Sequence, residues 1–177
     1  RYYAQQGWTV AVSARTETDL ELLAEELPAG QIKIFPLDVT DQEAVATTIY
    51  QIEHKVGEID LAILNAGTYT PTPAESFAVD PFRKLVETNL IGTVNGLAPL
   101  LEKFQKRLSG QIAVVASLAG YRGLPGAAAY GATKAGLINM CESLKPDLER
   151  YGVRLSVVNP GFIKTPLTAK NDFPMPF

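Results

Sequence analysis

The stretch Ile112-Ala-Val-Val-Ala-Ser117, which a Gly- and Pro-rich bend separates from Tyr130-Gly-Ala-Thr-Lys134, decides how the rest of this chain is interpreted. The apolar run predicts a buried strand, and the Ala-rich residues around Tyr130 predict a helix. Because residues four apart share a helix face, the ammonium of Lys134 is expected beside the phenol of Tyr130. Ser117 is expected at the carboxyl end of the strand, where open α/β sheets bind ligands. Taken alone, a Tyr and a Lys four residues apart are equally compatible with an ordinary half-exposed helix.

A phenol next to an ammonium favours acid/base chemistry. A free phenol titrates near pH ~10, but a nearby cation stabilises the phenolate and lowers the pKa of the phenol. We therefore expect Lys134 to lower the pKa of Tyr130, and Tyr130 to donate or accept a proton. The hydroxyl of Ser117 is suited to hold a carbonyl or hydroxyl oxygen.

Composition excludes several classes of protein. The 177 residues carry a net charge of -3 and are 46% hydrophobic, which suits one soluble domain spanning residues 1–177. The 16 Lys and Arg residues form no basic block, so no nucleic-acid partner is expected. No apolar run reaches the ~18 residues that a membrane span requires, so no membrane segment is expected. The single cysteine, Cys141, cannot form an internal disulfide, which fits a reducing, cytoplasmic compartment.

The other segments alternate between strand and helix patterns. Strands are predicted at 8–13, 32–37, 59–64, 111–116 and 153–158. Helices are predicted at 16–27, after a capping box at Thr40-Asp-Gln-Glu43, from an Asp80 N-cap and Pro81 to Leu108, and around Tyr130. This alternation predicts an α/β fold, a doubly wound parallel sheet with helices on both faces. The loops that begin at Ser13, Asp38, Asn65, Ser117 and Asn159 then form the ligand crevice, although turn residues are common at such positions in any globular chain.

With these positions in place, the chain resembles the short-chain dehydrogenase/reductase (SDR) family, whose fold is of the Rossmann type. The resemblance spans nearly the whole chain and rests on several motifs in the family's order. These motifs are Asn65-Ala66-Gly67, Asn89 within Thr-Asn-Leu-Ile-Gly, Ser117, Tyr130-x-x-x-Lys134, and Asn159-Pro160-Gly161 followed by Ile163 and Thr165.

The resemblance implies hydride transfer between a nicotinamide cofactor and a small-molecule alcohol or carbonyl substrate. It implies that Ser117 orients the substrate oxygen, that Tyr130 is the general acid/base, and that Lys134 binds the ribose and lowers the Tyr130 pKa. Asn89 would hold a water in a proton relay. The cofactor-binding residues implied are Arg15, Asp38, Val39, Asn65, Ala66, Gly67, Tyr130, Lys134, Pro160, Gly161, Ile163 and Thr165.

The turn after the second-strand position of the family indicates which cofactor is used. Arg15 stands where an acidic residue would bind a ribose 2′-hydroxyl, and an Arg can hold a 2′-phosphate instead, so NADP(H) is favoured over NAD(H). The alternative is that Arg15 is a solvated surface residue. Asp38 and Val39 resemble the pair that meets the adenine ring, although Asp38 is also a typical turn former.

The ends of the chain depart from the family pattern. The Gly-rich phosphate-binding turn precedes Arg1 in the family and a substrate-covering region follows the last residues, so we expect a Rossmann-type sheet that is incomplete at both ends. A homodimer or homotetramer is expected, because the long helix from Asp80 and the Tyr130 helix match those through which family members pair. In the long helix, Gly96, Ala98, Leu101 and Phe104 either face a partner or pack on the sheet.

Two other functions fit the same motifs. A nonenzymatic NADP-sensing or regulatory protein would use the same fold without turnover. A related epimerase or dehydratase would also use Tyr130 and Lys134. The only histidine, His54, falls on the polar side of a predicted helix, and no metal site is expected.

Overall fold

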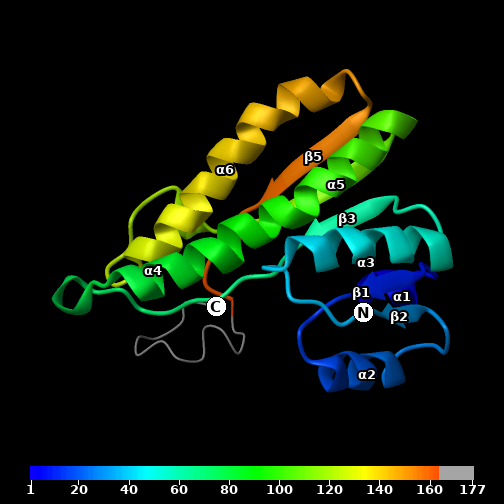
Figure 1. The fold of residues 1–177 in the computed structure, drawn as a ribbon, viewed down its shortest axis with the longest axis horizontal. Coiled ribbons are helices and arrows are strands. Elements are labelled where there is room, and N and C mark those ends of the chain that lie inside the picture. Colours follow the sequence, from blue (N-terminus) through cyan, green and yellow to red (C-terminus); the bar gives the residue numbers. More distant parts are fainter. Residues whose placement is uncertain (164–177) are drawn as a thin grey trace. The chain divides into compact units, whose positions relative to one another are not determined.

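The computed structural model describes residues 1–163 of the chain (Figure 1). Contacts divide the chain into two compact units, Arg1–Ile59 and Asp60–Phe177. That residues 1–177 form one domain stays a prediction.

The first unit contains a two-stranded parallel sheet. In it Val10 pairs with Ile32 and Val12 with Ile34. Figure 1 shows the two strands between the longer helices of this unit, α2 and α3. The elements are α1 (Tyr2–Gln5), β1 (Val10–Val12), α2 (Glu17–Glu25), β2 (Ile32–Ile34) and α3 (Gln42–Lys55).

The start of α3 differs from the expected capping box. The N-cap is Asp41, whose side chain accepts a hydrogen bond from the Ala44 N–H at 2.9 Å. Thr40 is not the cap, because its hydroxyl donates to Asp38 Oδ1 at 2.8 Å and its N–H donates to the same oxygen at 2.9 Å. The predicted capping box is therefore wrong by one residue, although the helix itself is present.

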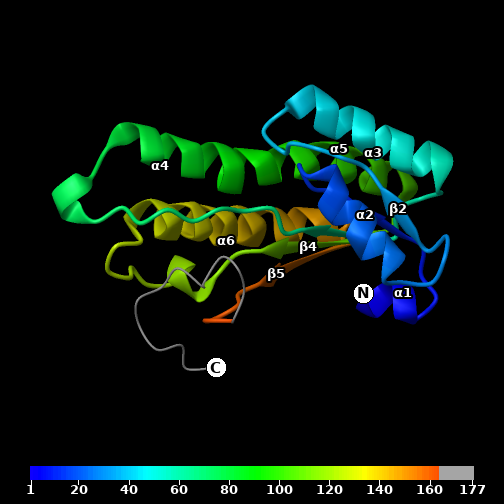
Figure 2. The same cartoon turned by 90° about the horizontal axis from the view of Figure 1, so that it is seen from below.

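The second unit contains a three-stranded parallel sheet in the order β3-β4-β5. Leu61 pairs with Gln111, and Gly110 pairs with Val153. Figures 1 and 2 together show α5 and α6 side by side on one face of this sheet. The elements are β3 (Leu61–Leu64), α4 (Val79–Leu85), a π-helix (Val86–Ile91), α5 (Gly92–Arg107), β4 (Gly110–Val115), α6 (Ala128–Glu149) and β5 (Val153–Val158), with short 3₁₀ turns at Ala74–Ser76 and Leu118–Gly120.

The long helix begins earlier than expected. It starts at Val79, and the N-cap Ala78 provides no side-chain hydrogen bond. Asp80 is therefore not the cap; its carboxylate lies in the first turn and pairs with Arg83 at 2.8 Å. The predicted cap is wrong by two residues.

The long helix packs on the sheet of the second unit through Phe104 and Gly96. Phe104 is fully buried, and a Cβ at Gly110 would lie 2.2 Å from its ring. Gly96 lets α5 approach β3, since a Cβ there would lie 3.0 Å from Leu64 Cδ2. Gly96 and Phe104 thus pack inside the unit rather than toward a partner. Cys141 is also buried, as expected, and burial raises the pKa of its thiol to about 11.

The fold class predicted from the sequence is confirmed. Both sheets are parallel, and helices alternate with strands along the described chain.

Candidate active site

Ser117 lies immediately beyond the carboxyl end of β4. The pairing of β4 with β5 continues past the last strand residue, because the Ala116 N–H donates to Val158 at 2.8 Å and the Leu118 N–H to Pro160 at 3.1 Å. Ser117 is the N-cap of the following 3₁₀ turn, and its Oγ accepts from the Ala119 N–H at 3.1 Å. The sheet and the turn together fix the position of the Ser117 hydroxyl.

Tyr130 and Lys134 lie in the first two turns of α6 and meet Ser117. The Ser117 hydroxyl lies near enough to the Tyr130 phenol to lower its pKa as a hydrogen-bond partner. Lys134 is only 4% exposed, and its Nζ donates to the Val115 carbonyl at 2.8 Å. The same Nζ lies 5.6 Å from the centre of the Tyr130 ring. The structure therefore brings Ser117, Tyr130 and Lys134 together at the end of one strand.

The pKa directions of this cluster follow from burial. Burial raises the pKa of Tyr130 and outweighs the hydrogen bond from Ser117, which lowers it; the nearby Tyr69 raises it further. Burial also lowers the pKa of Lys134 to about 8. The expected lowering of the Tyr130 pKa by Lys134 is not what dominates in this structure. The physical reason is that removal from water penalises both charged forms, the phenolate and the ammonium.

Asn89 is fully buried in the π-helix, and its side chain reaches out of the helix. Its Oδ1 accepts from the Thr68 N–H at 2.7 Å, and its Nδ2 donates to the Thr68 carbonyl at 2.9 Å. The Nδ2 also donates to Thr133 Oγ1 at 3.2 Å. The backbone carbonyl of Asn89 accepts from the Thr93 hydroxyl at 2.8 Å. Asn89 thus joins the loop after β3 to α6, beside Lys134.

The segment Asn65-Ala66-Gly67 follows β3 and is exposed. A Cβ at Gly67 would lie 3.4 Å from Asn89 Oδ1 and 3.7 Å from Lys134 Nζ. The lack of a side chain at Gly67 therefore leaves space next to the ammonium. An ammonium donates hydrogen bonds to hydroxyl, carbonyl or carboxylate oxygens, so Lys134 Nζ is a potential donor on this side of the cluster.

The loop after β5 carries a buried polar atom without a partner. Asn159 Nδ2 donates to the Tyr121 hydroxyl at 2.9 Å, whereas Asn159 Oδ1 is buried and has no hydrogen-bond partner in the described part of the chain. Gly161 approaches the Ser117 turn closely, since a Cβ there would lie 3.3 Å from Leu118 Cδ1. Ile163 is 55% exposed. Thr165 lies outside the described residues.

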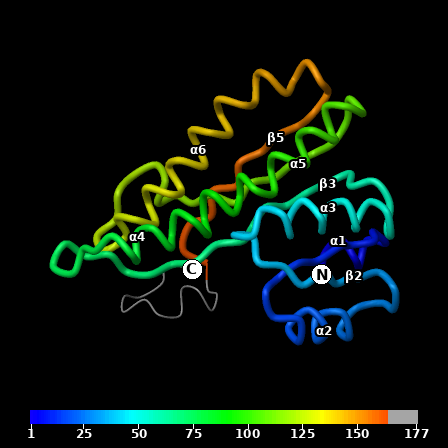
Figure 3. Tube along the Cα trace, in the orientation of Figure 1, coloured from blue at the N-terminus to red at the C-terminus, as the bar shows by residue number. Residues whose placement is uncertain are grey.

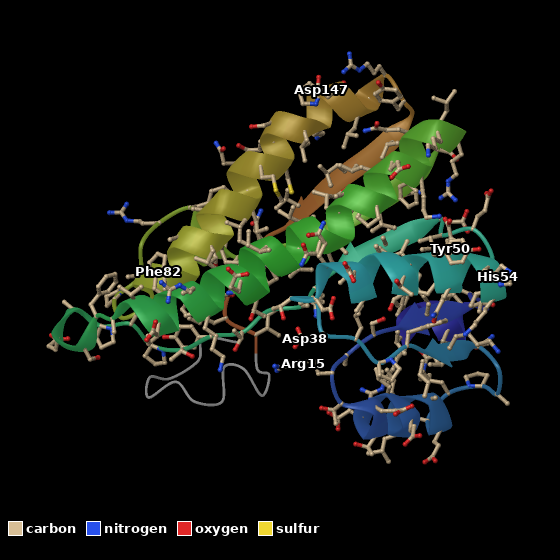
Figure 4. All side chains as sticks on the ribbon, in the orientation of Figure 1. Arg15, Asp38, Tyr50, His54, Phe82 and Asp147 are labelled. Atoms are coloured by element: carbon tan, nitrogen blue, oxygen red, sulfur yellow. The ribbon has the colours of Figure 1, made fainter. Side chains whose placement is uncertain are left out.

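In the first unit, Arg15 and Asp38 border a shallow hollow beyond the ends of β1 and β2, and Figure 4 shows both side chains projecting to the same side. The Thr40 N–H and hydroxyl are the main groups that hold the pKa of Asp38 below its ordinary value, with a smaller contribution from Arg15. Asp38 therefore acts as a turn former. The residues that line the hollow are Arg15, Pro36, Leu37, Asp38, Asp41 and Ala44.

Several residues of the cluster were not given a catalytic or supporting role by the sequence. The Tyr69 ring meets the Tyr130 ring edge to face, with centroids 5.4 Å apart. The Thr133 hydroxyl donates to the Tyr130 carbonyl at 2.7 Å, and the Thr72 hydroxyl accepts from the Ala129 N–H at 3.1 Å. The contacts of Tyr69 and Thr72 join residues that are distant in sequence, so no spacing rule reveals them. The Thr133 bond is a local contact within α6.

His54, the single histidine, lies in the first unit on α3. His54 stacks on Tyr50 along α3, with ring centroids 6.1 Å apart (Figure 4). Within residues 1–163, no group of three or more His, Cys, Asp or Glu side chains is placed to hold a metal ion. None of the helices in that range combines the length and apolar character that a membrane crossing requires.

Known proteins match this chain over nearly its whole length. Residues 1–174 match the short chain dehydrogenase family. An oxidoreductase of Myxococcus xanthus is 38% identical over 99% of the chain and 70% of its own length. A 3-oxoacyl-[acyl-carrier-protein] reductase of Thermotoga maritima is 32% identical over 95% of the chain and 69% of its own length.

Solved structures of oxidoreductases have a similar fold. ElxO with NADP bound superimposes with a TM-score of 0.89 at 27% identity, covering 96% of this chain and 69% of that one. An NAD⁺-bound xylitol dehydrogenase superimposes with a TM-score of 0.80 at 28% identity, covering 88% of this chain and 61% of that one.

Proposed function

Because this chain belongs to the short-chain dehydrogenase/reductase family of oxidoreductases, we propose that it transfers a hydride between NADP(H) and the carbon of an alcohol or carbonyl group. The observation that supports this proposal best is the contact of the Ser117 hydroxyl with the Tyr130 phenol, next to the buried ammonium of Lys134. A bound nicotinamide supplies the hydride chemistry, and the residues of the chain supply binding, orientation and proton transfer.

Ser117 and Tyr130 hold the substrate oxygen. In the reductive direction, both hydroxyls donate hydrogen bonds to the carbonyl oxygen, which becomes more negative as its carbon is reduced. Tyr130 then transfers its proton to that oxygen, which completes the alcohol. Burial raises the pKa of Tyr130, so the phenol carries its proton at neutral pH, as an ordinary phenol also does.

Lys134 binds the ribose and resupplies the proton. An ammonium has three N–H donors, and the Val115 carbonyl takes one of them. The space left by Gly67 is where we place the ribose hydroxyls. With a pKa of about 8, Lys134 exchanges protons readily near neutral pH. We place a relay water near the Asn89 carbonyl, which also accepts a hydrogen bond from the Thr93 hydroxyl at 2.8 Å.

The remaining cofactor contacts are those that the family resemblance implies. Arg15 binds the 2′-phosphate, which favours NADP(H) over NAD(H), and Asp38 with Val39 borders the adenine. Asn65, Ala66 and Gly67 lie against the cofactor beside Lys134. Pro160, Gly161, Ile163 and Thr165 hold the nicotinamide end, and the buried Asn159 Oδ1 marks this loop as one with an unused acceptor. The expected homodimer or homotetramer is part of the same proposal.

Two variants of the complete protein test the reaction. Tyr130→Phe removes the proton donor but keeps the ring, so reduction of a 3-oxo ester by NADPH should fall at least about 1000-fold, within the range for loss of an acid/base group. Ser117→Ala should lower the rate less than Tyr130→Phe does. Both variants should bind NADPH, measured by fluorescence titration, as the unchanged protein does. Undiminished turnover by Tyr130→Phe would overturn the proposal.

The direction and substrate class are measured in the same assay. The panel contains a 3-oxo ester with NADPH or NADH, and serine or xylitol with NADP⁺ or NAD⁺. NADP(H) should support turnover better than NAD(H) with whichever compound reacts. A consistent preference for NAD(H) would contradict the role of Arg15.

A further inference from the structure

The first turn of α6 is capped by a residue from a distant loop. The N-cap residue of α6 is Ala127, which has no side-chain acceptor. The N–H groups of a first helix turn have no partner within the helix, and a cap normally comes from the N-cap side chain itself. Here the Thr72 hydroxyl accepts from the Ala129 N–H at 3.1 Å, across 57 residues of sequence. Ala129 immediately precedes Tyr130, so this bond lies next to the proposed acid/base.

Thr72 is held firmly in that position. It is only 4% exposed, and its N–H donates to the Gly126 carbonyl at 2.8 Å. Thr72 and Ala127 thereby form an isolated parallel β-bridge. Figure 3 shows the loop between β3 and α4 passing the start of α6. A threonine has one hydroxyl hydrogen and a branched Cβ, so its rotamer is restricted and its oxygen is presented in a fixed direction.

The same loop touches the site at two further points. The Thr68 backbone is held by Asn89 at 2.7 and 2.9 Å. Between these two anchors, the ring of Tyr69 meets the ring of Tyr130 edge to face. The loop is therefore tied to the long helix at Thr68 and to α6 at Thr72, with the Tyr130 ring packed in between.

The geometry points to Thr72 as a positioning residue: its cap on the first turn of α6 sets where the Tyr130 phenol stands relative to the Ser117 hydroxyl. This inference rests on the proposed function, since it assigns Thr72 an effect on catalysis only through Tyr130. Small displacements of a reacting group are costly, and a shift of ~1 Å lowers rates by up to about 100-fold.

Two substitutions of Thr72 in the complete protein separate the hydroxyl from the side-chain shape. Thr72→Val keeps the volume, the branched Cβ and the N–H bond to Gly126, but it removes the cap. Thr72→Ser keeps the cap. We expect Thr72→Val to lower kcat for reduction of a 3-oxo ester about 10-fold, with KM for NADPH unchanged within about 2-fold, and Thr72→Ser to retain kcat within about 2-fold.

A readout that a purely structural role would not move is the pH profile of kcat. The cap acts on the distance between Tyr130 and Ser117. The apparent pKa that the kcat profile gives for the Tyr130 phenol should therefore shift in Thr72→Val and not in Thr72→Ser. Hydrogen exchange at the Ala129 amide should accelerate only in Thr72→Val. Equal kcat values and equal pH profiles for the two variants would overturn the proposal.

Comparing the Tyr130 and Thr72 variants distinguishes failure of the proposed reaction from failure of the positioning role. If Tyr130→Phe stays active, the proposed reaction is wrong, whatever Thr72 does. If Tyr130→Phe is inactive and Thr72→Val is unimpaired, only the positioning role is wrong. A Thr72→Val protein that does not fold, together with a Thr72→Ser protein of lowered thermal stability but normal pH profile, would also overturn it, because Thr72 would then support the fold alone.

Discussion

Asn89 binds Thr68 through both backbone groups of that residue, at 2.7 Å from Oδ1 to the N–H and at 2.9 Å from Nδ2 to the carbonyl. A carboxamide can pair with a backbone in this way because it offers an acceptor and a donor side by side. The third bond, to Thr133, ties the same side chain to α6. One buried side chain therefore connects the loop after β3, the long helix and the helix that carries Tyr130.

Replacing Asn89 should lower the stability of the fold. Asn89→Ala leaves the Thr68 groups without their partners, and we expect the free energy of unfolding to fall by about 2 to 4 kcal/mol. The comparison is Asn139→Ala on the exposed side of α6, which should change it by no more than about 0.5 kcal/mol. Urea unfolding measures both. A loss below about 1 kcal/mol for Asn89→Ala would mean that water replaces the carboxamide.

Two glycines of the α6 region should respond in opposite ways to a methyl group. A Cβ at Gly120 would lie 2.8 Å from the Lys134 backbone carbon and 2.6 Å from Ile138 Cδ1, whereas one at Gly136 would lie 3.5 Å from Leu90. Gly120→Ala should destabilise the fold by more than about 2 kcal/mol, because the backbone of α6 must move. Gly136→Ala should stabilise it by up to about 1 kcal/mol through helix propensity. Thermal unfolding of the two variants decides, and equal effects would contradict the packing described.

Cofactor affinity should depend on pH through Lys134. Its pKa of about 8 means that the ammonium is charged below that pH and is lost above it. If the ammonium binds the ribose, the Kd for NADPH should rise as the pH increases from 7 to 9.5. Lys134→Met should bind more weakly and show a flatter profile over that range. Fluorescence titration at each pH gives both Kd values, and parallel profiles would show that another group is responsible.

The same lysine should make stability depend on pH. The folded pKa of about 8 lies below the ordinary value of 10.5, so the unfolded chain binds more protons between these values. The free energy of unfolding therefore rises with pH in this window, and the gain is lost as pH falls through 8. Relative to Lys134→Met, it should rise by about 2 kcal/mol from pH 7.5 to 9.5, since one pKa unit corresponds to about 1.4 kcal/mol. Urea unfolding of both proteins at the two pH values measures the difference; no difference would place Lys134 in water.

Cofactor choice should follow Arg15. Arg15→Gln removes a charge-assisted contact to a 2′-phosphate, so the Kd for NADPH should rise about 10- to 100-fold while the Kd for NADH stays within about 2-fold. Arg150→Gln, an exposed arginine that follows α6, is the comparison and should leave both values unchanged. If Arg15→Gln weakens NADH equally, Arg15 does not distinguish the two cofactors.

The sequence predicted each strand of the described residues and the α/β class, because apolar runs and helical periodicity are local properties. It placed the start of two helices wrongly. Thr40 was expected to cap α3, but Asp38 already binds it, and Asp80 was expected to cap the long helix, but it pairs with Arg83. At α3 the neighbouring Asp41 is the cap, and the long helix begins after Ala78 without a side-chain cap, so a polar residue near a helix start did not fix the boundary.

The candidate site was predictable where it follows strand ends. Ser117, Tyr130 and Lys134 were placed together by spacing, and the structure brings them together. The Tyr130 pKa direction was missed because desolvation depends on how much of the unit surrounds the phenol, which a spacing rule does not include. Thr72 was missed because its partner is 57 residues away.

That long-range bond has a consequence for how the molecule assembles. Helix α6 can form from local hydrogen bonds, with Tyr130 and Lys134 already on one face, whereas the cap on its first turn requires closing a loop of 57 residues. Contacts of such sequence separation form slowly, since loop closure must precede them. During synthesis the loop that contains Thr72 leaves the ribosome before α6, so the bond to Ala129 cannot form until α6 has also been made. We therefore expect the contact that caps α6 beside Tyr130 to form after the local hydrogen bonds of that helix.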